Sequence, residues 1–121
     1  MVASAWGRRH LKAGDQILLT EMEHRSNLVP WRLLAQEMGV ELVFWPVRGM
    51  GEALDWEALD RLLTPRVKLV SCVHISNSLG VINPVQAICE RARENGSVSL
   101  VDGAQSGGHC PVDLQAIGCD L

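Results

Sequence analysis

Short apolar runs alternate along this chain with segments of helical periodicity, and this alternation constrains the fold more than any other feature. The strand-length runs are residues 16–20, 40–47, 67–75 and 98–101. Apolar residues recur every three or four positions between them, as in an amphipathic helix. Strands that alternate with helices favour a parallel sheet with right-handed crossovers, so we predict an α/β fold. The run 40–47 alternates only partly between apolar and polar residues, and we expect it to be buried on both faces.

Capping residues mark the expected ends of these helices. Ser26 or Asn27 is expected to cap the first helix, Asp55 the second and Asn83 the third. The segment 106–109 (Ser-Gly-Gly-His) is expected to be a flexible loop. The last three residues, Cys-Asp-Leu, have the pattern of a further strand just starting, so we expect the chain to be a piece of a larger α/β domain.

Composition and charge exclude several classes of protein. With 121 residues, 47% of them apolar, the chain is long enough to bury a core. A net charge of −3, with Lys and Arg scattered along the chain, provides no basic face for nucleic acid. No apolar run approaches the ~18 residues that span a bilayer, and Met1 begins no signal peptide. We therefore expect a cytoplasmic protein that binds neither nucleic acid nor a membrane.

The four cysteines are far apart and lack metal-binding or disulfide-framework spacing. We interpret Cys72, Cys89, Cys110 and Cys119 as reduced thiols, most of them small buried apolar residues. An alternative is a metal site built from Cys72 with His74 and from His109 with Cys110. Neither pair has a usual zinc spacing, so we expect no metal.

Polar residues follow three of the predicted strands at the points where the strands end. Glu23 and His24 follow the first, Ser76 and Asn77 the third, and residues 102–105 (Asp-Gly-Ala-Gln) the fourth. The carboxyl ends of parallel strands meet at one edge of a sheet, where ligands bind in open α/β folds. We therefore expect these side chains to converge on one crevice.

The chemistry of this set suits a flat aromatic ligand that carries heteroatoms. The Asp102 carboxylate, partly removed from water, needs a cationic partner such as a protonated ring nitrogen. Gly103 and Ala104 are small enough for a ring to lie close to the backbone, and Gln105 can hydrogen-bond its edge. The alternative is that Asp102 only caps the following turn and Gln105 is solvated.

Three segments, in this order, resemble the group II cysteine desulfurases of the class V aminotransferases. They are residues 23–31 (EHRSNLVPW), 74–80 (HISNSLG) and 101–105 (VDGAQ), and the resemblance covers nearly the whole chain. These enzymes have fold type I and depend on pyridoxal phosphate (PLP). The resemblance implies a parallel-sheet, three-layer α/β portion of the PLP-binding large domain. Residues 1–121 are then a partial domain that is incomplete at both ends.

Carried over residue by residue, the resemblance assigns five site residues. His24 would stack on the pyridine ring and take part in proton transfer, which makes it the candidate catalytic residue. Asp102 would keep the ring nitrogen protonated, so that PLP acts as an electron sink. Gln105 would bond the phenolic oxygen, with Asn77 near the same edge, and Ala104 would support the other face of the ring.

The resemblance also implies the activity of a parent enzyme. That enzyme would convert L-cysteine to L-alanine and pass the sulfur to an enzyme cysteine as a persulfide, for a sulfur-acceptor protein and iron–sulfur cluster assembly. It would be a homodimer. The Schiff-base lysine, the persulfide cysteine and the carboxylate-binding arginine would lie outside this chain, whose only lysines are Lys12 and Lys68. We expect the chain alone to be inactive and to bind PLP weakly and noncovalently at best.

Two alternatives remain open from the sequence. Another class V enzyme, such as a selenocysteine lyase or an aminotransferase, would share these motifs. Arg25 and the segment 106–108 depart from the desulfurase pattern. The second alternative is a non-catalytic, flavodoxin-like binding module.

Overall fold

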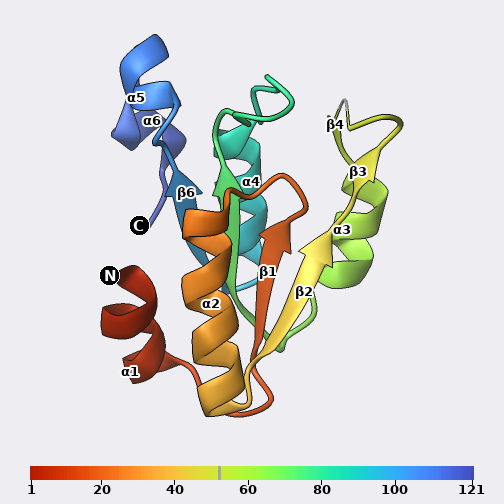
Figure 1. Cartoon of the computed structure of the whole chain (residues 1–121). Helices are drawn as coiled ribbons and strands as arrows, with labels where there is room; N and C mark the ends of the chain where they lie inside the picture. Colours follow the sequence, from red (N-terminus) through yellow and green to blue (C-terminus); the bar gives the residue numbers. More distant parts are fainter. Residues whose placement is uncertain (52) are drawn as a thin grey trace.

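The computed structural model describes residues 1–51 and 53–121 and forms a parallel sheet with helices on both sides (Figure 1). The elements in chain order are η1 (Ala3–Gly7), α1 (Arg8–His10), β1 (Gln16–Thr20), α2 (Arg25–Met38), β2 (Glu41–Trp45), β3 (Val47–Arg48), β4 (Ala53–Leu54), α3 (Trp56–Leu62), β5 (Val67–Val73), α4 (Val85–Glu94), β6 (Val98–Asp102), α5 (Ser106–His109) and α6 (Leu114–Ile117).

The main sheet has four strands in the order β2-β1-β5-β6. Every pairing in it is parallel, and Ile17 of β1 lies opposite Leu42 of β2 and Leu69 of β5. All four strands therefore end at the same edge, where their arrowheads point in Figure 1. The α/β parallel sheet predicted from the alternation of apolar runs is confirmed.

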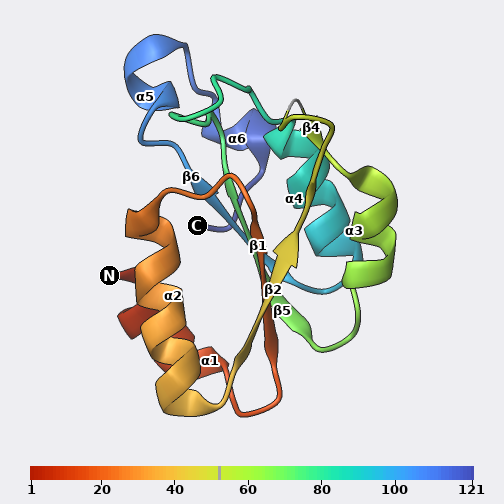
Figure 2. The same ribbon diagram turned by 45° about the vertical axis from the view of Figure 1, so that its right-hand side comes forward.

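Two apolar cores cover the two faces of this sheet. On β1, Leu18 packs into a core with α3 and α4, whereas Ile17 and Leu19 pack into a core with α2 and the N-terminal helices. Successive strand residues point to opposite faces, so one buried strand supplies both cores. Figure 2 shows the sheet nearly edge-on, with α2 on one side and α3 and α4 on the other. The expected three-layer arrangement is confirmed.

The prediction that residues 40–47 form a strand buried on both faces is wrong. The strand β2 is the edge of the sheet, and its residues Glu41 and Phe44 are exposed. It stops at Trp45 because Pro46 has no N–H for a sheet ladder. The chain then turns into a separate two-stranded hairpin, β3–β4, in which Val47 pairs with Leu54.

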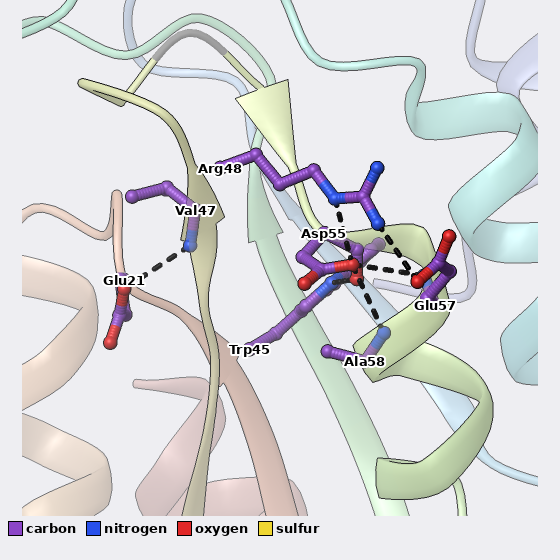
Figure 3. A network of polar contacts seen from close by, with 7 residues as sticks. All are labelled: Glu21, Trp45, Val47, Arg48, Asp55, Glu57 and Ala58. Carbon is purple, nitrogen blue, oxygen red and sulfur yellow. Dashed lines mark hydrogen bonds and ion pairs between the residues drawn. The ribbon is translucent and has the colours of Figure 1, made fainter.

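A polar network ties this hairpin to α3 (Figure 3). Asp55 caps α3 as predicted, because its Oδ1 accepts from the N–H groups of Glu57 (3.1 Å) and Ala58 (3.2 Å). The Arg48 guanidinium lies 3.1 Å from both Asp55 Oδ1 and Glu57 Oε2. On the opposite side of the hairpin, the Val47 N–H donates to Glu21 Oε2 at 3.2 Å.

Two of the predicted caps are wrong, because the side chains are used elsewhere. His24, not Ser26 or Asn27, is the N-cap of α2, and the Asn27 amide instead donates to other side chains. Pro84 is the N-cap of α4. Asn83 is buried, and its amide donates to the Val73 carbonyl at 2.8 Å. Both asparagine side chains therefore hydrogen-bond to β5 instead of capping a helix.

The segment 106–109 is a short helix, α5, and not the expected flexible loop. Ser106 is fully buried and its hydroxyl donates to the Gly103 carbonyl at 3.2 Å. The segment 119–121 makes two backbone hydrogen bonds of a parallel ladder with β6, from Leu121 N to Ser99 O and from Val101 N to Leu121 O. This agrees with the expected start of a strand, although no strand is assigned there.

All four cysteines are free thiols. Cys72 and Cys89 are buried, which confirms their interpretation as small core residues, whereas Cys110 and Cys119 are half-buried. Burial raises the pKa of the Cys72 thiol well above its usual value and keeps it protonated. Among residues 1–51 and 53–121, no helix is both long and apolar enough to cross a membrane.

Neighbouring leucines on α2 test the assignment of the two faces. Leu34 is 3% exposed in the core, whereas Leu33 is 55% exposed. We expect Leu34→Ala to lower the free energy of unfolding by about 2–5 kcal/mol, because it leaves a cavity. Leu33→Ala should change it by less than about 0.5 kcal/mol. Urea unfolding followed by circular dichroism measures both, and equal losses would contradict this packing.

Candidate functional site

A pocket of about 190 Å³ lies at the carboxyl edge of the sheet. It is lined by His24, Ser26, Val73, Ile75, Asn77, Asp102, Ala104 and Gln105. These residues come from the loop after β1, the end of β5 with its following loop, and the end of β6 with its following turn. The five predicted site residues therefore share one pocket, as the topology of a parallel sheet led us to expect.

His24 is held by the first turn of α2. The N–H of Ser26 donates to His24 Nδ1 at 3.2 Å, and the Ser26 hydroxyl lies 2.8 Å from the same nitrogen. The His24 carbonyl accepts from the N–H of Leu28 at 3.1 Å. Because a backbone N–H only donates, Nδ1 accepts, and the proton of the neutral ring is assigned to Nε2. The imidazole thus presents Nε2–H as its available polar atom.

Asp102 is the last residue of β6 and is half-buried. Its Oδ1 accepts from the Ala104 N–H at 3.0 Å, and its carbonyl accepts from the His74 N–H at 3.0 Å. Throughout 1–51 and 53–121, no ion pair involves Asp102. Asp102 lines the pocket, and within the described residues the Ala104 N–H is the only group bound to this carboxylate, which was expected to need a cationic partner.

The other three predicted residues are exposed and lie on the loops around the pocket. Asn77 follows Ser76, whose hydroxyl accepts from the Leu79 N–H at 3.2 Å and fixes the turn after β5. Gln105 is the N-cap of α5. Ala104 leaves the turn after β6 without a bulky side chain, so the pocket stays open to a flat group on that side.

Glu23 lies behind the pocket, and the sequence indicated its position but not its role. Its carboxylate accepts from the Thr20 hydroxyl, the Asn27 amide and the Val73 N–H at 2.5, 2.7 and 2.9 Å. Burial raises the pKa of Glu23; these hydrogen bonds oppose the rise, and the negative charge of Asp102 adds to it. A polar residue at the end of a buried strand was the available signal.

A larger hollow of about 320 Å³ adjoins the pocket on the side of the N-terminal helix. It shares Ser26 and Asp102 with the pocket but none of the other predicted site residues. The smaller pocket is therefore the candidate site. Over the described residues, no group of three or more His, Cys, Asp or Glu side chains is arranged to hold a metal ion, and Cys72, His74, His109 and Cys110 form no such group.

Comparison with known proteins assigns the family. The family model described as "Aminotransferase class-V" matches residues 1–121. The chain belongs to the class-V aminotransferase family. This confirms the family inferred from the three motifs, and the fold class inferred with it.

Two proteins similar to this class-V chain are named cysteine desulfurases. A "Cysteine desulfurase" of Yersinia pestis is 48% identical over 121 residues, which are all of this chain and 30% of that protein. The crystal structure of the cysteine desulfurase CsdA from Escherichia coli has a TM-score of 0.92 and 35% identity, covering 99% of this chain and 30% of that one. This chain thus spans about 30% of the length of the proteins that it matches.

Another similar structure contains the cofactor PLP. A variant of the C-DES protein, with glycine covalently linked to its PLP cofactor, has a TM-score of 0.81 and 31% identity. The match covers 92% of this chain and 30% of that one.

The raised pKa of Glu23 predicts a pH-dependent contribution to stability. The folded chain binds this proton more tightly than the unfolded chain, whose Glu has a pKa near 4.5. The contribution is therefore complete below that value and is lost as the pH rises through the raised pKa. Asp102 on β6 and Cys72 on β5 are the titratable groups that face Glu23.

We expect the wild type to lose stability relative to Glu23→Gln as the pH rises from below 4.5. Urea unfolding at a series of pH values measures this difference. Glu21→Gln is the matched control, because Glu21 is exposed and only two residues away. Parallel stability curves for the wild type and Glu23→Gln would contradict the raised pKa.

Proposed function

We propose that this chain forms part of the PLP-binding large domain of a cysteine desulfurase. The observation that carries the proposal is the convergence of His24 and Asp102 on one pocket at the carboxyl edge of the sheet. The similarity to cysteine desulfurases over the whole chain supports it. The PLP cofactor of the similar C-DES structure supports the choice of ligand.

The residues around the pocket fit the chemistry of PLP. A pyridinium nitrogen is a cation, and Asp102 offers a half-buried carboxylate that no cation of the described chain pairs. An aromatic ring can lie between the imidazole of His24 and the small side chain of Ala104. Amide groups at Asn77 and Gln105 suit the oxygen at the ring edge.

The pocket is smaller than a complete cofactor site. Its volume of about 190 Å³ lies below the roughly 300–1,000 Å³ typical of small-molecule sites. Lys68 is the second residue of β5 and Lys12 precedes β1, so both lysines lie at the end of the sheet opposite to the pocket. We therefore propose that other parts of a longer protein supply the Schiff-base lysine, the phosphate-binding loop and the remaining walls.

Each side chain then has a defined task. Bound PLP supplies an electron sink for a carbanion of the substrate amino acid. Asp102 accepts a charge-assisted hydrogen bond from the protonated ring nitrogen and keeps the proton there. His24 would cover one face of the ring, and its Nε2–H is the group left for proton transfer, because Nδ1 accepts from the Ser26 N–H. Gln105 and Asn77 orient the ring from its edge.

The longer protein would act on L-cysteine and release L-alanine. The sulfur of the substrate would pass to a cysteine of the enzyme, which then carries it as a persulfide. From there it would pass to an acceptor protein for iron–sulfur cluster assembly. We propose that this protein works as a homodimer in the cytoplasm. A selenocysteine lyase or another class V enzyme would use the same pocket. In a flavodoxin-like module without chemistry, Asp102 would only cap the turn after β6 through the Ala104 N–H.

Replacing Asp102 tests the cofactor site directly. We expect the chain to bind PLP reversibly, and Asp102→Asn to weaken binding roughly 10- to 100-fold, since a hydrogen bond to a charged group contributes about 1.5–3 kcal/mol. Titration followed by PLP absorbance measures the affinity. Asp60→Asn removes the same charge from α3, on the opposite face of the sheet, and should leave affinity unchanged. Equal affinity for the wild type and Asp102→Asn would exclude this site.

The positions of the lysines predict noncovalent binding by the chain alone. Borohydride reduction in the presence of PLP, followed by mass spectrometry, should leave Lys12 and Lys68 modified no more than in the unfolded chain. With L-cysteine and PLP, the chain should release no sulfide above the background of free PLP. A stoichiometric adduct at either lysine, or sulfide above background, would contradict the proposal that the lysine comes from elsewhere in the protein.

A further inference from the structure

Glu23 does not line the pocket, but its hydrogen bonds hold the loop that carries the pocket residue His24. It immediately precedes His24, and its carboxylate is turned away from the pocket into the body of the protein. Three donors from three different elements meet there: the hydroxyl of Thr20 at the end of β1, the N–H of Val73 at the end of β5, and the amide of Asn27 in the first turn of α2. The carboxylate therefore joins the β1–α2 loop to the neighbouring strand.

Asn27 extends this connection beneath the loop. Its Nδ2 donates to Glu23 Oε2 at 2.7 Å and to the Ser71 hydroxyl of β5 at 2.8 Å. Its Oδ1 accepts from the indole N–H of Trp31 at 3.3 Å, one helical turn further along α2. Both Ser71 and Trp31 are fully buried, so this end of the network is fixed by the core.

The imidazole of His24 depends on the same turn. Its Nδ1 accepts from the Ser26 N–H, and its carbonyl accepts from the N–H groups of Asn27 and Leu28. Movement of the loop away from β5 would carry His24 with it. The side chain itself is exposed, and its Nδ1 contacts Ser26, which lies in the turn that the Asn27 hydrogen bonds join to Glu23 and to β5.

We infer that Glu23 is a positioning residue that fixes the place and tautomer of His24 at the pocket. Its significance for PLP rests on the proposed function, but its effect on the His24 ring does not. Both carboxylate oxygens serve as acceptors, Oε1 for Thr20 and Val73 and Oε2 for Asn27. A glutamine would keep one oxygen acceptor and would turn an NH₂ group toward another donor.

Nuclear magnetic resonance of the His24 ring nitrogens in the full 121-residue chain tests this inference without cofactor. In the wild type we expect the pattern of one fixed tautomer, with the proton on Nε2. In Glu23→Gln this pattern should shift toward an average of the two tautomers. Glu21→Gln, a matched control whose carboxylate contacts Val47 instead, should leave it unchanged. An unchanged His24 pattern in folded Glu23→Gln would overturn the inference.

Thr20→Val provides a second, nearly isosteric variant in case Glu23→Gln does not fold. It removes one of the three donors to Glu23. We expect it to shift the His24 pattern in the same direction as Glu23→Gln, by a smaller amount. A folded Thr20→Val variant with the wild-type His24 pattern would count against the inference.

A double-mutant cycle separates positioning from a general effect on the fold. We expect Glu23→Gln to weaken PLP binding about fivefold in the wild type and less than twofold in the His24→Ala background, because the effect passes through His24. Equal losses in both backgrounds would overturn the inference. If the wild-type chain binds no PLP, the proposed cofactor site fails, and the ring-nitrogen spectra still decide the role of Glu23.

Discussion

Parallel pairing of β1, β5 and β6 is the constraint on which the rest of this structure depends. It forces the three strands to end at one edge of the sheet, and helices bury both faces of that sheet, as is usual for parallel strands. Residues 24, 77 and 102 are far apart in the sequence. They share one pocket because each lies at or shortly after the carboxyl end of a paired strand.

Burial of the Glu23 carboxylate beneath the pocket costs free energy, but it links the elements that carry His24. Desolvation of the Glu23 carboxylate is unfavourable, and three hydrogen bonds offset much of that cost. The same bonds join β1, α2 and β5 at the point where His24 enters the pocket. We interpret the Glu23 carboxylate, which does not line the pocket, as the group that keeps the exposed His24 imidazole in place.

Membership in the class-V aminotransferase family and similarity to cysteine desulfurases agree with this geometry. The chain covers about 30% of those proteins. We propose that Asp102 and His24 line one side of a site that other segments complete. The proposed enzyme needs further groups for the covalent chemistry, and the pocket volume is consistent with a site that is shared with other segments.

The sequence by itself determined the four strands of the main sheet and their parallel direction, the cap at Asp55 and the grouping of His24, Asn77, Asp102, Ala104 and Gln105, but it did not predict the hairpin β3–β4. These follow from local periodicity and from the rule that parallel strands end together. Only the tertiary structure decided that β2 is an exposed edge, that residues 106–109 are helical and that Asn27 and Asn83 brace strands instead of capping helices. Each of these depends on which distant groups are within hydrogen-bonding reach, such as Ser71 for Asn27 and the Val73 carbonyl for Asn83. Local sequence carries no record of those partners, because they meet only when the sheet has formed.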